Sequence, residues 1–422
     1  MKGTIKFVDV KTGLWGFIVP EDGSPDVHLD VSDFSGPRPG PADAGLPIEF
    51  DLDEADGKRH ARSPRLLAAP SPPSARQEVP GKALTRWAFV PFVPFTNSEG
   101  RRYATVTELL ASVALPERWH FGQDPDPEDP YPILKNYLTY TFHRLQREGK
   151  LVEYRSAQES WAAFNPGLVD SLYDRIFALF TQNRRQEPEW YFHDFCVPGK
   201  GKSGKQLTSV FDPLPKAATY FSNSFDMLLD TSRDIHVDYE HVIMDGIRRD
   251  RFPHAFVESH CPKGWQEEKY WEFAADKREA YLGKLASAIA DDVQCLRGIK
   301  SRLEDAKGLA EKRTSWNFKT AIPQYYPRYD TMSLLLPLAI VNDEVVDVAL
   351  VVTRNPSGSY QGRTVLPLAW AYMNARLVCR PDSDWLVPDR IEPEEFASED
   401  DQARDAEVVG EEDTPAPPPA LA

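Results

Sequence analysis

The stretch "GLWGFIVP", residues 13–20, decides the fold of the N-terminal part of the chain. It crowds large apolar side chains around a single glycine, Gly16. Side chains two residues apart on a strand point to the same face, so Trp15 and Phe17 share one face of a strand. That pair of rings either fills a core or is kept open for a flat ligand.

Four more strand-like segments lie within residues 1–68, each separated from the next by a turn-rich piece. They read "GTIKFVDV", "DVHLDV", "LPIEFDLD" and "RHARSPRLL". Short strands bounded by Gly, Pro, Asn and Asp are typical of all-β modules. Five such strands in 68 residues predict a small closed barrel of the oligonucleotide-binding (OB) type.

The same residues resemble a cold-shock domain along its full length. "GFI" matches the end of that family's first ribonucleoprotein motif, and "DVHLDVS" stands in the place of the second. The resemblance implies that Phe7, Trp15 and Phe17 face outward and stack unpaired bases, with Lys6 beside them for phosphate. Each stacked base contributes ~1–3 kcal/mol.

Departures from the family pattern weaken this platform. The segment from Asp9 to Gly16 is one residue longer than usual, and the second motif reads His28, Leu29, Asp30, Val31. His28 still offers a ring, whereas Asp30 brings a negative charge and Val31 brings no ring. Two interpretations stay open: a binder of single-stranded RNA or DNA, and a drifted barrel that docks a protein or acts as a spacer.

The charge of the 422-residue chain, −16 in total, is unevenly distributed. Residues 391–422 hold eleven acids and one arginine, so 1 − 11 = −10. This composition predicts a disordered acidic tail, and the Pro-rich residues 69–84 predict a linker. The sequence therefore predicts a multidomain protein: the OB barrel at 1–68, a larger α+β domain at 85–390, and the tail.

Other composition features bear on location and cofactors. The four cysteines are far apart, which predicts free thiols and neither a disulfide framework nor a metal site; no cofactor is expected. The N-terminus has no apolar h-region, and the apolar run 334–341 is too short to span a bilayer. We expect a cytoplasmic protein without a membrane partner.

Helices are predicted at 105–115, 132–150 and through much of 240–312. A hairpin is predicted at 151–168, and buried strands at 332–341 and 345–354. Residues 104–168 thus follow the order of a winged helix, which would present Arg144, Arg147 and Lys150 to a phosphate backbone. The plainer alternative is a helix–hairpin unit packed into a larger core.

Several blocks of this region resemble a bacterial family known as domain of unknown function 3825. They include "PILKNYLTYTFHRLQREGK", "NFKTAIPQYYP" and "GRTVLPLAWAYMNARLVCRPDSDWL". The resemblance implies membership and no activity, and it transfers no catalytic residue. Its members occur beside nucleic-acid-binding modules, as here.

A glycine- and lysine-rich segment, "GKGKSGK" at 199–205, fits the pattern G-x-x-x-x-G-K of a phosphate-binding loop. Gln206 stands where a Ser or Thr would hold Mg²⁺, which argues against a nucleoside triphosphatase. We interpret the segment as a mobile basic loop. Its cations, Lys200, Lys202 and Lys205, would contact phosphate without specificity.

The densest polar cluster is "DIHVDYEHVIMDGIRRDRFPH", 234–254. Asp238 is a candidate cap for a helix on which His241, Asp245 and Arg248 share one face. Three interpretations stay open: acid–base or metal chemistry, an RNA-contacting helix end with Arg248 and Arg251, or an ordinary structural helix.

Residues 312–329 mix aromatic and basic side chains, and two interpretations stay open: RNA contacts through Trp316 and Lys319, or an ordinary buried loop made irregular by Pro323 and Pro327. Arg376, near Asp382 and Asp384, is the corner of a site or half of an internal ion pair.

The leading hypothesis from the sequence is a protein that binds single-stranded RNA or DNA through the barrel. One alternative is an RNA-processing enzyme whose active site lies in 165–385. Another is an adaptor that binds protein partners through 85–390.

Overall fold

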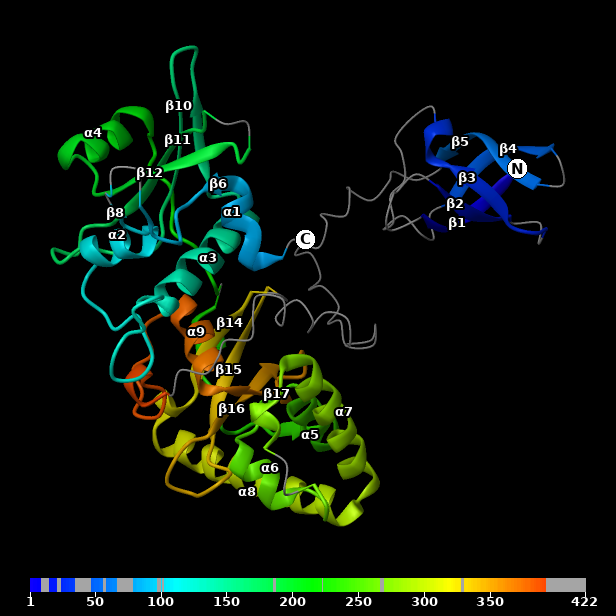
Figure 1. Ribbon diagram of the computed structural model, residues 1–422, viewed down its shortest axis with the longest axis vertical. Coiled ribbons are helices and arrows are strands. Elements are labelled where there is room, and N and C mark those ends of the chain that lie inside the picture. The colour runs from blue at the N-terminus through cyan, green and yellow to red at the C-terminus, as the bar shows by residue number, and fades with distance from the viewer. Residues whose placement is uncertain are drawn as a thin grey trace. The chain divides into compact units, whose positions relative to one another are not determined.

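The computed structural model divides the chain into two units, Met1–Glu78 and Val79–Ala422. It describes residues 1–8, 15–20, 24–34, 47–55, 58–66, 79–96, 100, 102–184, 187–221, 223–265, 269–327 and 330–391 (Figure 1). Most of the predicted linker and acidic tail lies outside these residues. Ile391, placed in the tail by the sequence, is buried, and its carbonyl accepts a hydrogen bond from the Gly122 N–H.

The first unit is a closed five-stranded barrel, as predicted. Its strands are β1 (Lys2–Val8), β2 (Trp15–Pro20), β3 (Val27–Asp30), β4 (Pro47–Ala55) and β5 (Lys58–Leu66), joined in the order β1-β2-β3-β5-β4. Alternate residues fill the barrel: Ile18 on β2 and Leu29 on β3 are both fully buried. The interior is completed by aliphatic and aromatic side chains, among them Ile5, Val27, Val31, Phe34, Ile48 and Phe50.

The second unit begins with a five-stranded sheet that carries helices on both faces. Its strands are β6 (Ala88–Phe89), β12 (Trp190–Cys196), β11 (Phe177–Gln182), β10 (Ser160–Phe164) and β9 (Val152–Arg155), in that spatial order. α1 (Ala83–Trp87) and α3 (Pro132–Arg147) lie on one side, and α4 (Gly201–Val210) lies on the other (Figure 1).

The helices predicted at 105–115 and 132–150 form at the capping and apolar patterns that predicted them. α2 (Val106–Val113) starts at Thr105, whose side chain accepts from the Glu108 N–H while Glu108 bonds back to the Thr105 N–H. The stripe Leu134, Leu138, Phe142 and Leu145 of α3 is buried, as its spacing predicts, and Gly149 follows the helix with φ +62°.

The predicted hairpin forms as β9 and β10, but these are two strands of the larger sheet. This is the arrangement of the plainer alternative to a winged helix. The cations of the proposed wing have partners within the unit. Arg144 contacts Asp330 and Glu148, Arg147 lies 3.2 Å from Asp330, and Lys150 lies 2.7 Å from Glu148. These three side chains therefore form ion pairs within the unit, in place of the contacts with a phosphate backbone that the winged-helix interpretation predicts.

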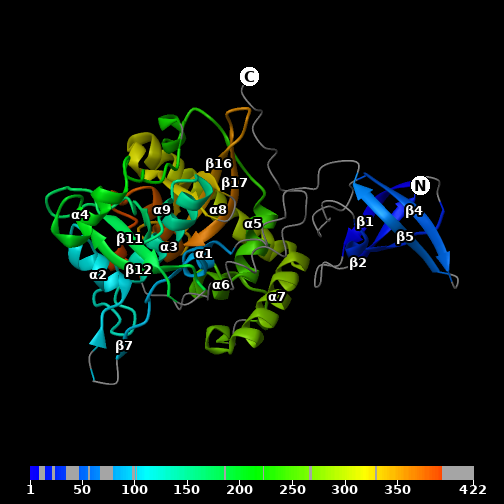
Figure 2. The ribbon, with the colours of Figure 1, turned by 90° about the horizontal axis from the view of Figure 1, so that it is seen from above.

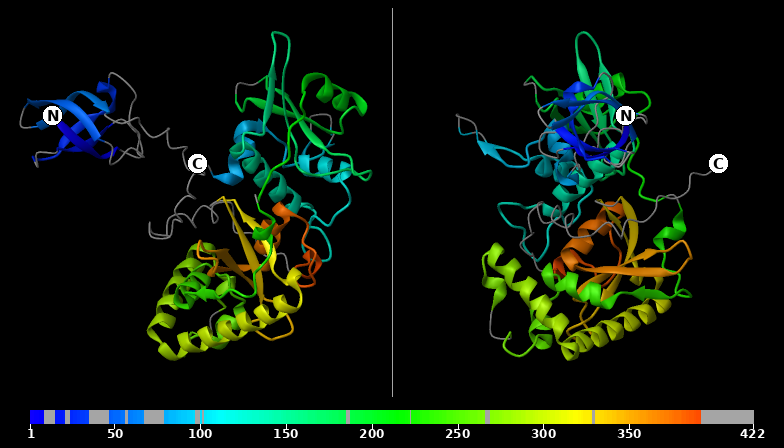
Figure 3. Two further views of the ribbon diagram at one scale, coloured as in Figure 1. Left: turned by 180° about the vertical axis from the view of Figure 1, so that it is seen from behind. Right: turned by 90° about the vertical axis from the view of Figure 1, so that its right-hand side faces the viewer.

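A second sheet has the order β13 (Ile235–Val237), β17 (Tyr360–Pro367), β16 (Val348–Arg354), β15 (Thr331–Leu338) and β14 (Ile322–Tyr326). The buried strands predicted at 332–341 and 345–354 are β15 and β16. One face packs against α9 (Leu368–Val378), and the other against helices that include α5 (Tyr239–Arg248), α6 (His254–His260), α7 (Ala275–Asp291) and α8 (Val293–Trp316) (Figure 3).

One hydrophobic core joins both sheets of the second unit. It contains Phe164 and Phe180 of the first sheet, Leu335 and Val351 of the second, and Phe142 of α3. A short hairpin of β7 (Phe95–Thr96) and β8 (Arg102–Tyr103) projects from this unit (Figure 2). The prediction of an α+β domain is confirmed.

Candidate functional site

Three aromatic side chains cluster on the outer face of the barrel. Phe17 of β2 pairs with His28 of β3, and Trp15 pairs with Asp30. The Trp15 and His28 rings are stacked, with centroids 6.2 Å apart, and the Phe17 ring meets both edge-on. Trp15 is 39% exposed, whereas Phe17 and His28 are half-buried. The outward orientation expected of Trp15 and Phe17 is what the structure shows.

A fourth ring joins this cluster and was missed from the sequence. His60 of β5 is the register partner of His28, and the two imidazole centroids are 5.0 Å apart. β3 and β5 are neighbours only because the barrel closes, so the pair has no local signal. The alternation of His60 with the buried Ala61 was the one available hint. We call Trp15, Phe17, His28 and His60 the ring face.

Charges around the ring face are largely paired. Lys6 is exposed, and its Nζ lies 2.7 Å from the Asp26 Oδ2. The backbone of Phe7 pairs with that of Phe17, but its side chain lies outside the described part of the structure. Arg62 of β5 contacts Asp53 at 3.1 Å and Asp33 at 3.7 Å. Cations are therefore present, with acids beside them.

Asp30 has a structural task at the edge of the ring face. Its carboxylate accepts from the Ser32 hydroxyl at 2.7 Å and from the Ser32 N–H at 2.9 Å, which caps the short 3₁₀ helix η1 (Val31–Asp33). These hydrogen bonds hold the pKa of Asp30 below its usual range, and the nearby His28 and His60 act in the same direction. Asp30 is thus a fixed negative charge beside the rings.

The lysine-rich segment is a helix and not the mobile loop expected from its sequence. α4 begins at Gly201, so Lys202 and Lys205 lie on a helix, both exposed. Lys200 precedes the helix and contacts Asp174 at 2.7 Å and Asp170 at 3.2 Å. The glycine of the G-K pair, Gly204, serves close packing and not phosphate binding. A Cβ there would lie 2.0 Å from the Val197 carbonyl oxygen.

We expect Gly204→Ala to lower the free energy of unfolding by about 1–3 kcal/mol, because α4 must move away from a backbone oxygen. Gly308→Ala, within α8, is the matched control: nothing lies within 4 Å of a Cβ there. That control should be neutral or stabilise by up to ~1 kcal/mol. Urea denaturation of both variants measures the difference. Equal effects would show that the Val197 contact does not constrain α4.

The candidate catalytic set His241, Asp245 and Arg248 does not assemble around a shared centre. Asp238 caps α5 as predicted, with its carboxylate accepting from the His241 N–H. His241 and Arg248 are exposed, while Asp245 contacts Arg249, Arg251 and the Thr364 hydroxyl.

Arg251, proposed as an RNA contact, is only 5% exposed and cannot reach a large ligand. Its guanidinium donates to Asp245 and to the Thr364 hydroxyl, which lies outside α5. Helical spacing alone could not reveal these partners.

The remaining candidates separate into exposed and internal groups. Trp316, at the end of α8, is 92% exposed, and Lys319 is exposed but lies 2.7 Å from Asp382. Arg376 is buried and forms a two-pronged ion pair with Glu117, so the internal interpretation holds for it. Asp382 is the partner of Lys319 and not of Arg376.

Comparison with known families identifies the second unit. A family model described as "Domain of unknown function (DUF3825)" matches residues 110–385, more than half of the chain. The chain belongs to the DUF3825 family. No curated protein matches the sequence. The DUF3825 match covers both sheets of the second unit apart from β6.

Within the described residues, no group of three or more His, Cys, Asp or Glu side chains is placed to hold a metal ion. No helix in this described part combines the length and apolarity that a membrane span requires.

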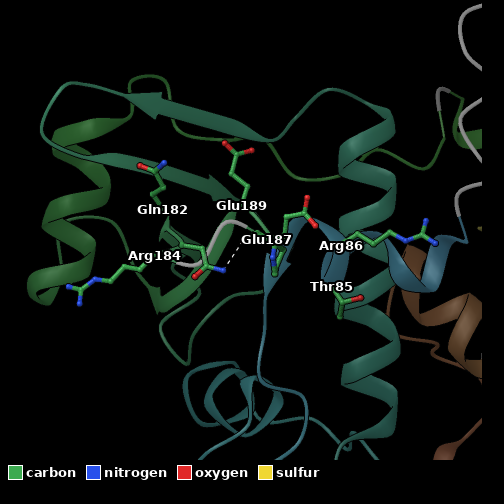
Figure 4. A pocket seen from close by; sticks show the side chains of 8 residues that line it. Thr85, Arg86, Gln182, Arg184, Glu187 and Glu189 are labelled. Carbon is green, nitrogen blue, oxygen red and sulfur yellow. Dashed lines mark hydrogen bonds between the residues drawn. The ribbon is translucent and has the colours of Figure 1, made fainter.

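The DUF3825 unit contains an open cavity of about 1030 Å³ between α1 and the ends of β11 and β12. It is lined by Thr85, Arg86, Gln182, Asn183, Arg184, Glu187, Pro188 and Glu189. Arg86 and Arg184 extend in opposite directions, and Glu187 and Glu189 add the opposite charge (Figure 4). These groups do not converge on one ligand, so the cavity defines no anion site.

Proposed function

We propose that this protein binds single-stranded nucleic acid, RNA or DNA, and that its barrel is an OB barrel of the cold-shock type. The ring face carries the proposal. Trp15, Phe17, His28 and His60 gather on the outside of a barrel whose interior is already filled by other apolar side chains. Rings held outside a complete core are available to stack on bases, which all present a π-face.

The arrangement also favours weak sequence preference. Stacking accepts any base, and the described face adds few unpaired cations for phosphate. Lys6 and Arg62 each lie beside an acid, so a nucleic acid must compete with Asp26 and Asp53 for them. Binding should therefore be moderate, with a shallow dependence on salt.

Fluorescence anisotropy with the full chain tests the proposal. Labelled single-stranded RNA and DNA of about 10 nucleotides, within the range that one OB barrel covers, should bind. The same sequences as duplexes should bind less well, because their bases are stacked on each other and cannot reach the rings. Equal affinity for single strands and duplexes would contradict base stacking.

Removing the charge of Asp30 should strengthen binding. Asp30→Asn keeps a side-chain oxygen that can accept from Ser32, so η1 keeps its cap, and it removes a negative charge next to the rings. We expect a gain of about 0.5 kcal/mol, roughly twofold, at low salt and less at high salt.

Glu49→Gln, on β4, is the matched control for this charge change. Glu49 is exposed and pairs in register with Lys2 and Arg65, and its strand β4 is a neighbour of neither β2 nor β3, which carry the stacked pair. A gain of the same size in both variants would show that only the net charge matters, and not the position of Asp30.

Removing the acidic tail should also strengthen binding. Residues 392–422 carry eleven acids and only one arginine. Their carboxylates compete with the phosphates of the nucleic acid for the cations of the protein. Truncation after Ile391 keeps that buried residue in place. Affinity for single strands should rise several-fold at low salt and converge with that of the full chain as salt screens the tail. Unchanged affinity at low salt would exclude competition by the tail.

A further inference from the structure

The first sheet of the DUF3825 unit carries a row of aromatic side chains on one face. The register joins Tyr154 to Trp161, Trp161 to Thr181, Thr181 to Tyr191, and Tyr191 to Phe89. Directly paired residues point to the same side of a sheet. The row crosses all five strands, a span of about 19 Å at ordinary strand spacing. We call these five residues, four aromatic side chains with Thr181 between them, the aromatic row.

The fold leaves this row open while covering its neighbour. Two residues along each strand lies the row of Val152, Ala163 and Leu179, on the same face. Ala163 and Leu179 are fully buried in a cluster with Leu207 of α4. The cluster around α4 therefore covers this row, and in the aromatic row only Trp161 packs against it among the described residues. In the aromatic row Phe89, Tyr191 and Tyr154 are each about 40% exposed, at 43%, 45% and 39%.

The exposed rings are ordered with respect to one another. Phe89 and Tyr191 are stacked, with centroids 5.4 Å apart and an interplanar angle of 9°. The His193 ring, two residues along from Tyr191, meets Trp161 edge-on at 5.4 Å. The Trp161 indole N–H donates to Glu159, which fixes the orientation of that ring. Rings held in this way lose little conformational entropy when a flat ligand stacks on them.

Charges at the flanks match a polyanion. Lys202 and Lys205 are exposed on α4 beside the covered row, and Arg184 is exposed just beyond the end of β11. Glu159 and Glu189 also lie near the row, but Glu159 bonds the Trp161 ring and Glu189 lies 2.7 Å from Arg155. The surface thus combines exposed rings, on the edge strands β6 and β9 and on β12, with cations on α4 and beyond the end of β11.

We propose that the aromatic row is a second binding surface for single-stranded nucleic acid, independent of the barrel. Aromatic side chains on the open face of an antiparallel sheet stack bases in other RNA-binding modules. Aromatic side chains are also common in protein interfaces, so the occupant is assigned from charge: Lys202 and Lys205 are exposed on the helix beside the row, and lysine is depleted at protein interfaces. Lys202 and Lys205 on α4, which the sequence suggested as phosphate contacts, would then bind the phosphates of the nucleic acid that lies across this sheet.

The second unit offers a matched pair for the test. Phe95 and Tyr103, on the projecting β7–β8 hairpin, are also stacked, with centroids 4.5 Å apart, and are similarly exposed (Figure 2). Phe89→Ala/Tyr191→Ala removes the stacked pair of the row, and Phe95→Ala/Tyr103→Ala removes the control pair. Both double variants are made in the full chain, and in the full chain that also carries Trp15→Ala/Phe17→Ala.

Binding is measured with labelled oligouridylate and oligodeoxythymidylate of about 20 nucleotides, longer than one OB barrel covers. With the barrel variants present, the row variant should weaken the remaining binding by about tenfold or more, and the control pair should leave it within about twofold. Ultraviolet cross-linking should place uridine on peptides that contain Phe89, Trp161 or Tyr191. Thermal melts of each variant confirm that the sheet still folds.

The outcomes separate this proposal from the function proposed for the barrel. If the row variant matches its control, the row does not bind nucleic acid, whatever the barrel does. If the barrel variants change nothing while the row variant weakens binding, the barrel proposal fails and the row stands. Loss of self-association in the row variant with unchanged oligonucleotide binding would identify the face as a protein contact and overturn the proposal.

Discussion

Trp15→Ala and Phe17→Ala should each weaken the binding of short single-stranded RNA by ~1–3 kcal/mol, about 5- to 150-fold. Trp15 should have the larger effect because it is the more exposed ring and is stacked on His28. Phe17 touches both of these rings edge-on, so its loss also frees their orientation. Anisotropy titrations of the full chain, in one buffer and at one salt concentration, measure the changes.

Val19→Ala is the control on the same strand. Val19 follows the alternation of Trp15 and Phe17 and is 42% exposed, but it has no ring. We expect its affinity to stay within about twofold of that of the parent chain. If all three variants bind equally, the ring face does not contact the bases, and the adaptor hypothesis becomes the better account of the barrel. The three variants are also made in the chain that carries Phe89→Ala/Tyr191→Ala, so that binding to the aromatic row cannot mask the result.

Local alternation predicted the strands of the barrel, and the resemblance to a cold-shock domain implied the outward position of three of the four rings of the ring face. Ile18 and Leu29 point inward because they alternate with Trp15, Phe17 and His28 along two adjacent strands. His60 could not be assigned in this way, since its proximity to His28 depends on how the sheet closes.

The aromatic row was not predicted either, because its residues are brought together only by the pairing of strands that are distant in the sequence. Trp161 and Tyr154 belong to a hairpin that the sequence predicts, but Tyr191 and Phe89 come from strands distant along the chain. A face built from four separate segments has no signature in any one of them.

The errors in the second unit arose where a local pattern competed with tertiary contacts. Three glycines in "GKGKSGK" favour a loop, yet Gly204 is there because α4 packs on the Val197 carbonyl. The spacing of His241 and Asp245 fits a catalytic pair, yet Arg251 and Thr364 occupy the Asp245 carboxylate. In both cases the sequence identified the unusual residues, but helical periodicity could not predict which side chains and backbone atoms they contact.

The ion pair between Glu117 and Arg376 should be among the most costly contacts to break in the second unit. Arg376 is 7% exposed and donates from Nε and Nη2 to the two Glu117 oxygens, at 2.6 and 2.8 Å. Its guanidinium carbon also lies 4.7 Å from the ring centroids of Trp119 and Tyr137. The contact joins the segment before α3 to α9, which are 259 residues apart at the paired positions.

Glu117→Ala should lower the free energy of unfolding by about 3–5 kcal/mol, because it leaves the Arg376 charge buried among aromatic rings without a counter-charge. Asp382→Ala is the control: it breaks the pair with Lys319, in which both charged groups are exposed, and should change the stability little. Urea denaturation of the full chain, followed by circular dichroism, compares the two. The double variant Glu117→Leu/Arg376→Met should recover most of the loss, since an apolar pair of similar volume carries no desolvation cost. A mild effect of Glu117→Ala, equal to that of Asp382→Ala, would mean that water reaches Arg376 and that the pair does not hold α9 against the rest of the unit.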